Sequence, residues 1–222
     1  MKYAHFAILL SVSLLSSAVT PKYSASVVPK NMSVETKKKR FYYLLVPAVE
    51  KVHAELMTRY KKIAQDVKDG ENAKEIAKLR KAYYVKTDKE LLACLKPHPQ
   101  SIVLAQAALE SSWGTSRFFT QAKNIFGIRS MDENEPRIIA GGKRVWLKKF
   151  DSVEASVRGY YKIMAKVKVF KEFRALRLQT DNPHELVKKL DEYSEIGAEY
   201  GKALSQVIRH NKLIRYDKKR LR

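Results

Sequence analysis

The sequence predicts a mainly helical protein of the α+β kind, in which one small β-hairpin accompanies a helical domain and a helical extension precedes it. Over most of the 222 residues, apolar side chains recur every three or four positions, as amphipathic helices require. Residues 127–150 differ, because the runs RIIA and RVWL flank a Gly141-Gly142 pair and predict a hairpin with its turn at 140–143. A hydrophobic content of 45% is enough for one well-packed domain with accessory helices.

Residues 1–18 predict an export signal. Lys2 precedes an apolar run over 4–15, and Ser16 and Ala18 are placed as in a signal-peptidase site. The alternative is an uncleaved signal that anchors the chain to the inner membrane. Either way, we expect the protein in the periplasm or cell envelope.

The next two segments predict a linker and a basic helical extension. Residues 19–32 are rich in Ser, Pro, Lys and Val without periodicity, which is typical of a linker. Residues 33–95 form the extension, with helices expected over 37–68, 72–83 and 88–95. Pro47 should kink or split the first of these helices, and Asp88 is the expected N-cap of the third.

The main domain is expected over 96–213, after a break at Lys96-Pro-His-Pro99 and before a basic tail over 214–222. Further helices are expected over 100–113, over 151–167, from Asn182-Pro183 and over 198–211.

Lysine and arginine dominate the charge. The 44 basic residues against 23 acidic ones give a net charge of +21, which favours anionic partners such as nucleic acid, lipid phosphate or an acidic polymer. Export makes nucleic acid a poor candidate and favours cell-wall polymer, with peripheral membrane contact as a further option. The single cysteine, Cys94, lies in an apolar run and is expected to be a buried hydrophobe. The five scattered histidines form no metal motif, so the sequence predicts neither a metal site nor a cofactor.

The stretch SIVLAQAALESSWGTS, residues 101–116, places a carboxylate on a central helix. Seven of the eight positions over 102–109 are apolar, and only Gln106 interrupts them before Glu110. A helix that is apolar all round belongs in the core, and Gly114 predicts its left-handed stop. Poor hydration and the negative end of the helix dipole should both raise the pKa of Glu110, as a general acid requires. The alternative is a surface carboxylate that pairs with Arg117.

The paired motifs QAALESSWG (106–114) and NIFGI (124–128) resemble a known family. They are similar to the glucosaminidase domain of lysozyme-like peptidoglycan hydrolases, described as mannosyl-glycoprotein endo-β-N-acetylglucosaminidase-like. The closer resemblance is to the bacterial Bax-related proteins, which share an export signal and a basic helical extension. It covers roughly 97–211. It implies a lysozyme-like fold with the hairpin bordering a cleft, and cleavage of β-1,4 bonds at N-acetylglucosamine in peptidoglycan glycan strands.

The resemblance also implies catalytic residues. Glu110 matches the catalytic glutamate that protonates the glycosidic oxygen, and the family usually carries a second carboxylate on the hairpin. Glu133 is the first choice and Glu135 the second, with Asp132 also present, and each has the alternative of a solvated turn charge. The 2-acetamido group of the sugar can itself assist, and a retaining or an inverting outcome stays open.

A tyrosine turn, YSEIGAEY over 193–200, completes the expected site. Tyr193 matches the family tyrosine near the catalytic glutamate, where its hydroxyl would orient the acetamido group or hold Glu110. The alternative is a tyrosine packed at a helix junction.

Several residues are candidates for substrate binding: Trp113, Asn124, Phe126, Trp146 and Tyr200. Trp146 on the hairpin is the best candidate for a cleft wall, because sugar rings stack on aromatic side chains. Asn124 has the alternative of fixing its loop through hydrogen bonds to the backbone. Tyr160 lies in a helical apolar pattern and is expected in the core.

Two other functions stay open. A lytic transglycosylase of the same fold superfamily would carry Gly-Leu-Met-Gln after Glu-Ser, whereas residues 124–127 read Asn-Ile-Phe-Gly. A non-catalytic wall or nucleic-acid binding module would use the basic runs KKKR and KKRLR with nearby tyrosines. The sequence leaves the oligomeric state and the role of the extension open.

Overall fold

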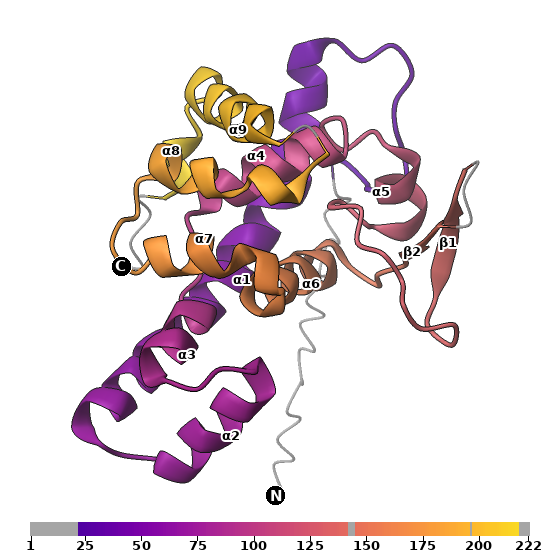
Figure 1. The fold of residues 1–222 in the computed structure, drawn as a ribbon. Helices are drawn as coiled ribbons and strands as arrows, with labels where there is room; N and C mark the ends of the chain where they lie inside the picture. Colours follow the sequence, from indigo (N-terminus) through magenta and orange to yellow (C-terminus); the bar gives the residue numbers. More distant parts are fainter. Residues whose placement is uncertain (1–21, 142–144, 196, 218–222) are drawn as a thin grey trace, which may run out of the picture.

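The computed structural model describes residues 22–141, 145–195 and 197–217. Its α-helices are α1 (Val34–Asp69), α2 (Ala73–Tyr83), α3 (Asp88–Leu95), α4 (Gln100–Glu110), α5 (Arg117–Ala122), α6 (Val153–Lys166), α7 (Lys171–Leu176), α8 (Pro183–Leu186) and α9 (Ala198–His210). The strands are β1 (Arg137–Ala140) and β2 (Val145–Lys148), and the 3-10 turns are η1 (Lys168–Phe170), η2 (Val187–Lys189), η3 (Asp191–Tyr193) and η4 (Leu213–Tyr216). Figure 1 shows α4 in the midst of the upper group of helices, with α2 and α3 at the lower left and the hairpin projecting at the right.

Some predictions fall outside the described residues. These are the export signal over 1–18, residues 142 and 143 of the hairpin turn and the end of the basic tail. Within the part of the chain that the structure describes, no helix combines the length and apolar character that crossing a bilayer needs.

The predicted core helix is confirmed. Every residue of α4 from Gln100 to Ala108 is buried, and α1, α9 and η4 pack against it. Burial on all sides follows from the apolar composition of this segment. Because α4 cannot shift without disturbing this packing, its last residue, Glu110, has a fixed place in the fold.

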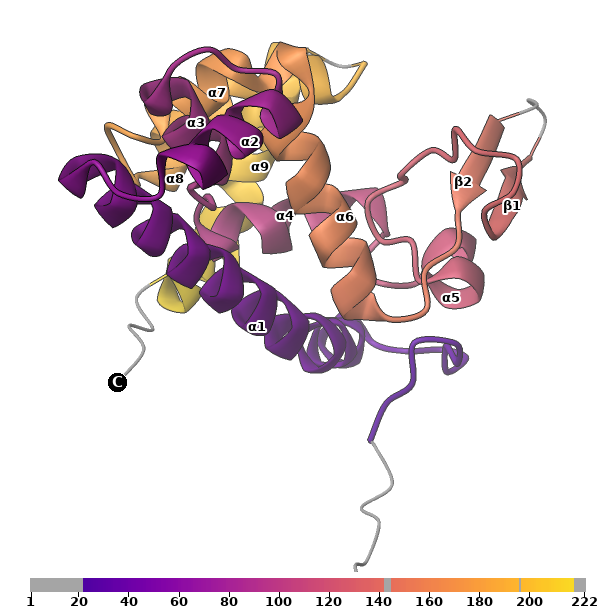
Figure 2. The ribbon, with the colours of Figure 1, turned by 90° about the horizontal axis from the view of Figure 1, so that it is seen from below.

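α1 contributes to two cores. Phe41, Leu45 and Val49, in its first half, are fully buried in the main core together with α4. The second half joins α2 and α3 in a smaller cluster of Ile63, Ile76, Leu91 and Leu95. Figure 2 shows α1 as one long rod that links the two regions. The first part of the extension is therefore a structural part of the main domain.

Pro47 does not split α1, contrary to one of the two predicted outcomes, because the helix continues through it to Asp69. Proline lacks a backbone N–H, so the carbonyl of Tyr43 has no helical partner. Tyr43 lies on the exposed side of α1, where that carbonyl can bind water.

Two helix ends differ from the prediction. The N-cap of α3 is Thr87 instead of Asp88, because the Thr87 hydroxyl accepts from the backbone N–H of Glu90 and the Glu90 carboxylate accepts in return from Thr87. The core helix ends at Glu110 instead of continuing to Trp113, because Ser112 and Trp113 adopt positive φ angles.

The hairpin is confirmed. β1 and β2 pair in antiparallel register, with Ile138 opposite Leu147 and Ile139 opposite Trp146. The short helix α5, which the sequence analysis did not predict, packs against strand β1 of the hairpin. Its Arg117 donates from Nη2 to the carbonyl oxygen of Ile139 over 2.6 Å.

Candidate active site

The end of α4 is locked by its own loop. The Ser111 hydroxyl donates to the carbonyl oxygen of Ala107 and accepts from the backbone N–H of Gly114 over 2.8 Å. Gly114 has a φ of 74°, which confirms the predicted left-handed stop. The chain therefore turns sharply just after Glu110 and fixes the backbone from which its side chain projects.

A buried arginine braces this loop from α1. Arg40 has no solvent-exposed surface, and its Nη1 donates to the carbonyl oxygen of Gly114 over 2.6 Å. Its other side-chain nitrogens donate to the carbonyl oxygens of Ser24, Ala25 and Val27. Burial lowers the pKa of Arg40 but leaves the guanidinium charged near neutral pH. One side chain thus ties the linker and α1 to the loop beneath Glu110.

Glu110 lies at the rim of the core. Its Oε1 accepts a hydrogen bond from the Tyr200 hydroxyl over 2.7 Å, and the residue as a whole is exposed to solvent. Removal of water by the surrounding protein raises the pKa of Glu110, and the bond from Tyr200 partly opposes this rise. Arg117, the alternative partner of Glu110, donates to the hairpin instead.

The two tyrosines of the turn lie together near Glu110, and Tyr200 is the one that binds its carboxyl. Tyr200, proposed for substrate binding, is buried at 3% exposure and holds Glu110 through its hydroxyl. Tyr193, expected to orient the acetamido group or to hold Glu110, stacks its ring on that of Tyr200 with centroids 5.3 Å apart and planes at 9°. Tyr200 lies on the first turn of α9, which packs against α4, whereas Tyr193 lies on η3, which packs against α9.

Gln106 is a site residue to which the sequence analysis gave no role. It lies one helical turn before Glu110, and its Nε2 donates to the Tyr200 hydroxyl over 3.3 Å. Gln106 is the one polar interruption of the apolar run, and this was the available signal. A fully buried amide needs hydrogen-bond partners, so it points to a buried polar group nearby.

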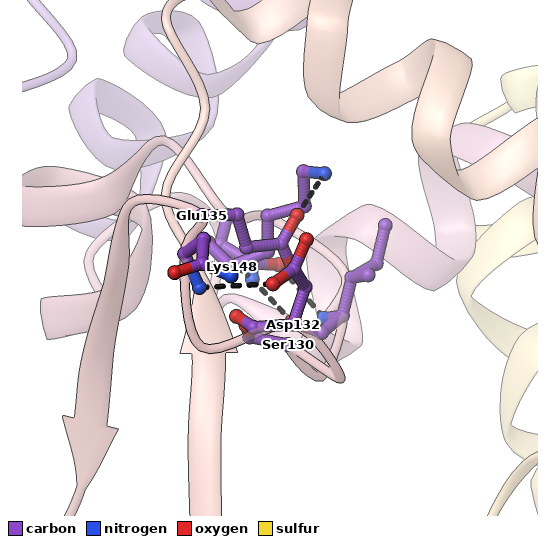
Figure 3. Close-up of polar contacts among 7 residues, drawn as sticks. Ser130, Asp132, Glu135 and Lys148 are labelled. Atoms are coloured by element: carbon purple, nitrogen blue, oxygen red, sulfur yellow. Dashed lines mark hydrogen bonds and ion pairs between the residues drawn. The ribbon is translucent and has the colours of Figure 1, made fainter.

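Glu135, which precedes strand β1 of the hairpin, has a carboxylate that neighbouring side chains hold in place. It forms an ion pair with Lys148, and hydrogen bonds from Lys148 and Ser130 lower its pKa (Figure 3). Its side chain is only 21% exposed. Glu135 is therefore ionised at neutral pH in a fixed place.

The other two hairpin acids have less defined surroundings. Glu133 is 88% exposed at its side chain and lies 3.9 Å from Arg137. Asp132 accepts from the backbone N–H of Asn134 through Oδ1 over 2.9 Å, which makes it a turn-forming residue. Of the three hairpin acids, Glu135 is thus the one whose side chain is held in place, whereas the sequence analysis put Glu133 first.

The two tryptophans differ in accessibility. Trp146 on β2 is 37% exposed, and the Arg137 guanidinium lies 4.4 Å from its ring centroid. Trp113 is half-buried against Phe41, with centroids 5.2 Å apart, and Lys38 lies over its ring. Trp146 retains the exposed surface that stacking on a sugar needs, whereas Trp113 braces the loop against α1.

Asn124 and Phe126 are buried, so the structure does not support their proposed contact with substrate. The Asn124 amide donates to the carbonyl oxygens of Ile128 and Lys148 and accepts from the N–H of Ile128. This is the loop-fixing alternative. Phe126 stacks on Tyr160 with centroids 4.2 Å apart.

Cys94 is buried, as expected, and burial raises the pKa of its thiol. Among the described residues, no three His, Cys, Asp or Glu side chains gather closely enough to hold a metal ion.

Solved structures to which this chain is similar include an autolysin domain and a peptidoglycan hydrolase. The catalytic domain of the autolysin Auto from Listeria monocytogenes matches with a TM-score of 0.51 and 17% identity, over 84% of this chain and 90% of that domain. A peptidoglycan hydrolase from Sphingomonas sp. A1 matches with a TM-score of 0.45 and 22% identity, over 60% of this chain and 92% of that one. The first match supports the predicted fold class.

Sequence comparison identifies the family. Protein bax of Escherichia coli (strain K12) is 30% identical over 119 residues, which are 51% of this chain and 43% of that protein, so the match spans less than half of this relative. The family described as Glucosaminidase, mannosyl-glycoprotein endo-beta-N-acetylglucosaminidase, matches residues 89–213. This range contains Glu110, Tyr200 and the whole hairpin and exceeds half of the chain. The chain therefore belongs to the glucosaminidase family.

Proposed function

We propose that this protein is an exported peptidoglycan hydrolase that cleaves β-1,4 bonds at N-acetylglucosamine, with Glu110 as the general acid. The main support is the Glu110 carboxyl. It is fixed at the end of a buried helix, its pKa is raised, and it accepts a hydrogen bond from Tyr200. Family membership and the names of the similar proteins support the substrate class.

In this mechanism, Glu110 supplies the proton. A neutral Glu110 carboxyl transfers its proton to the glycosidic oxygen, and the bond between that oxygen and the anomeric carbon breaks with its electron pair on the departing sugar. Water then adds to the anomeric carbon, and its released proton restores the carboxyl. A raised pKa keeps the acid protonated closer to neutral pH.

Glu135 is the second carboxylate in this proposal. The positive charge that develops at the anomeric carbon needs an ionised group, and the lowered pKa of Glu135 supplies one. Carboxyls whose pKa values are shifted in opposite directions are typical of an acid paired with an ionised partner. The sugar's own acetamido group is the alternative stabiliser.

The charge of the chain suits the substrate. A net charge of +21 attracts a wall polymer that carries muramyl and peptide carboxylates, and added salt should weaken this attraction. The predicted export signal would bring the enzyme to that polymer.

Product analysis tests the proposal. Purified sacculi are digested with the protein, and the released fragments are analysed by mass spectrometry. A new reducing-end N-acetylglucosamine supports the hydrolase, whereas a 1,6-anhydro end would identify a lytic transglycosylase. Binding to sacculi with no released product would identify a non-catalytic wall-binding module.

A further inference from the structure

A chain of hydrogen bonds crosses the core and ends on Glu110. In order, its members are Arg177, His98, Tyr160, Gln106, Tyr200 and Glu110. The five side chains before Glu110 have exposures between 0% and 3%, so water cannot replace their bonds. They come from α4, α6, α9, the end of α7 and the loop before α4, and thus connect most of the core to one carboxyl.

The chemistry of Arg177 fixes the direction of the first two bonds. A guanidinium can only donate, so His98 must accept at Nδ1, 3.3 Å from Nη1. Burial and the Arg177 charge lower the pKa of His98, so the imidazole is neutral and carries its hydrogen on Nε2. That Nε2–H therefore donates to the Tyr160 hydroxyl oxygen over 2.7 Å.

The remaining bonds follow the same direction. Because the Tyr160 oxygen accepts from His98, its own hydrogen goes to Gln106 Oε1. This bond turns the amide so that Nε2 faces Tyr200, 3.3 Å from its hydroxyl oxygen. The hydrogen of Tyr200 then points to Glu110 Oε1. The Arg177 guanidinium, which can only donate, and the Glu110 carboxyl at the other end therefore fix the direction of every hydrogen bond between them.

The start of the chain is anchored. Arg177 also donates from Nη2 to the carbonyl oxygens of Ala93, over 2.7 Å, and Cys94, over 3.2 Å, at the end of α3. The guanidinium cannot rotate without losing these bonds, so His98 keeps its donor.

We propose that Arg177, His98, Tyr160 and Gln106 are positioning residues that hold the Tyr200 hydroxyl as a donor to Glu110 Oε1 and so keep the transferable proton on Oε2. This inference rests on the proposed role of Glu110 as the general acid. Because Glu110 Oε1 accepts the hydrogen bond from Tyr200, the carboxyl proton is more stable on Oε2 than on Oε1. When Oε2–H gives its proton to the glycosidic oxygen, the new carboxylate binds Tyr200 more strongly than the neutral acid did.

Removal of one hydroxyl in the chain should release this arrangement. Without the Tyr160 hydroxyl, Gln106 Oε1 has lost its donor, and the amide can turn over to present Oε1 to Tyr200. Tyr200 then has two acceptors and leaves Glu110 part of the time. The titratable groups that face Glu110 are the phenols of Tyr200 on α9 and Tyr193 on η3, both neutral near pH 7 because burial raises their pKa values.

The test compares Tyr160→Phe with Tyr161→Phe. The Phe ring keeps the stack on Phe126 and removes only the chain hydroxyl. Tyr161 is a matched control, because it is a neighbouring buried phenol whose hydroxyl donates to the backbone carbonyl of His98 over 3.4 Å, outside the chain. The readouts are the 13C NMR titration of the Glu110 carboxyl, assigned with Glu110→Gln, and the pH profile of sacculus digestion.

For Tyr160→Phe, we expect the Glu110 titration to move to higher pH and kcat to fall with KM unchanged. The fall should be smaller than the roughly tenfold loss expected when Tyr200→Phe removes the hydrogen bond to Glu110 altogether, because Tyr200 leaves Glu110 only part of the time. Tyr161→Phe should match the parent in both readouts. In a Tyr200→Phe background, Tyr160→Phe should add no further shift, because its effect passes through Tyr200.

A parent-like titration and kcat in Tyr160→Phe would overturn the inference, and so would a further shift in the double variant. If Tyr160→Phe fails to fold by circular dichroism, Gln106→Met tests the same break in the chain. The titration needs no substrate, so it reports on the chain even if the parent protein releases no product, which would refute the proposed function alone.

Discussion

Tyr200 on α9 donates its phenol hydrogen to Glu110 Oε1 at the end of α4 over 2.7 Å. The contact joins residues 90 positions apart, and it acts against the effect of burial on the Glu110 pKa. Two opposing influences therefore set the acidity of one carboxyl. In the proposed hydrolase, this balance keeps Glu110 protonated often enough to act and still able to release its proton.

The tyrosine turn yields the first prediction. Tyr200→Phe should lower kcat about tenfold, the loss expected for one hydrogen bond to a charged group. It should also move the basic limb of the pH profile upward, because the bond from Tyr200 lowers the Glu110 pKa. Tyr193→Phe keeps the ring that stacks on Tyr200 and should stay within about threefold of the parent. Rates of sacculus digestion measure both, and an equal loss in the two variants would restore the catalytic role first predicted for Tyr193.

The hairpin acids yield the second prediction. Glu135→Gln should lower kcat about a hundredfold, as the loss of a catalytic carboxylate does. Glu133→Gln, the matched control two residues away, should behave like the parent, because its side chain is exposed. If Glu133→Gln shows the larger loss in the same digestion assay, the assignment from sequence was right and Glu135 serves only the turn.

Lys148 gives a third prediction, which concerns the acid limb of the pH profile of activity. Lys148 and Ser130 lower the pKa of Glu135, so the ionised form persists as the pH falls toward this lowered value. Lys148→Met removes the largest cause and should raise that pKa. Activity that needs ionised Glu135 should then be lost at a higher pH than in the parent. An unchanged acid limb, measured as kcat/KM against pH, would contradict a catalytic Glu135.

Arg40 gives a prediction on stability. Arg40→Met leaves four carbonyl oxygens without this donor and should lower the free energy of unfolding by about 3 kcal/mol. Lys39→Met is the control, because Lys39 is exposed and pairs with Glu35 on the same helix. Urea titrations of the two variants should separate clearly, and equal midpoints would show that Arg40 does not brace the loop.

Two histidines whose pKa values are lowered by loss of hydration predict acid sensitivity. Burial lowers the pKa of His53 to about 4 and that of His98 well below the usual 6.5. Below pH 6.5 the unfolded chain takes up protons that the folded protein excludes, so stability falls by roughly 1.4 kcal/mol per pH unit for each histidine. For His53 this loss continues down to about pH 4.

His53→Gln checks this prediction in urea titrations at pH 7, 6 and 5. The variant should lose stability less steeply than the parent over this range. Acidic groups that titrate in the same window are common to both proteins, so the difference isolates His53. Parallel curves would show that His53 takes up its proton in the folded state.

The sequence was sufficient for features that depend on local pattern. The apolar run over 102–109 predicted the core helix and put Glu110 at its end, because a helix that is apolar on all sides must lie in the core. Gly114 and the RIIA and RVWL runs predicted the stop and the hairpin for similar local reasons. The Asp88 cap was wrong by one residue, since Thr87 can form the reciprocal pair with Glu90 and Asp88 cannot.

Features that depend on tertiary contacts were beyond the sequence. Tyr193 and Tyr200 belong to the same short segment of sequence, 193–200. Only the packing of α9 on α4 decides which of their hydroxyls reaches Glu110. Gln106 stood out as polar, but its partners lie 54 and 94 positions away in the chain. The extension showed a helical period, but period alone does not tell that the first half of α1 shares a core with α4.

The most direct test of the central claim is the activity of Glu110→Gln on purified sacculi. The change keeps the size of the side chain and removes the proton donor, and a pull-down with the same sacculi verifies that binding is intact. We predict normal binding with at least about a hundredfold fewer reducing ends released than by the parent. Release at the parent rate would contradict Glu110 as the acid.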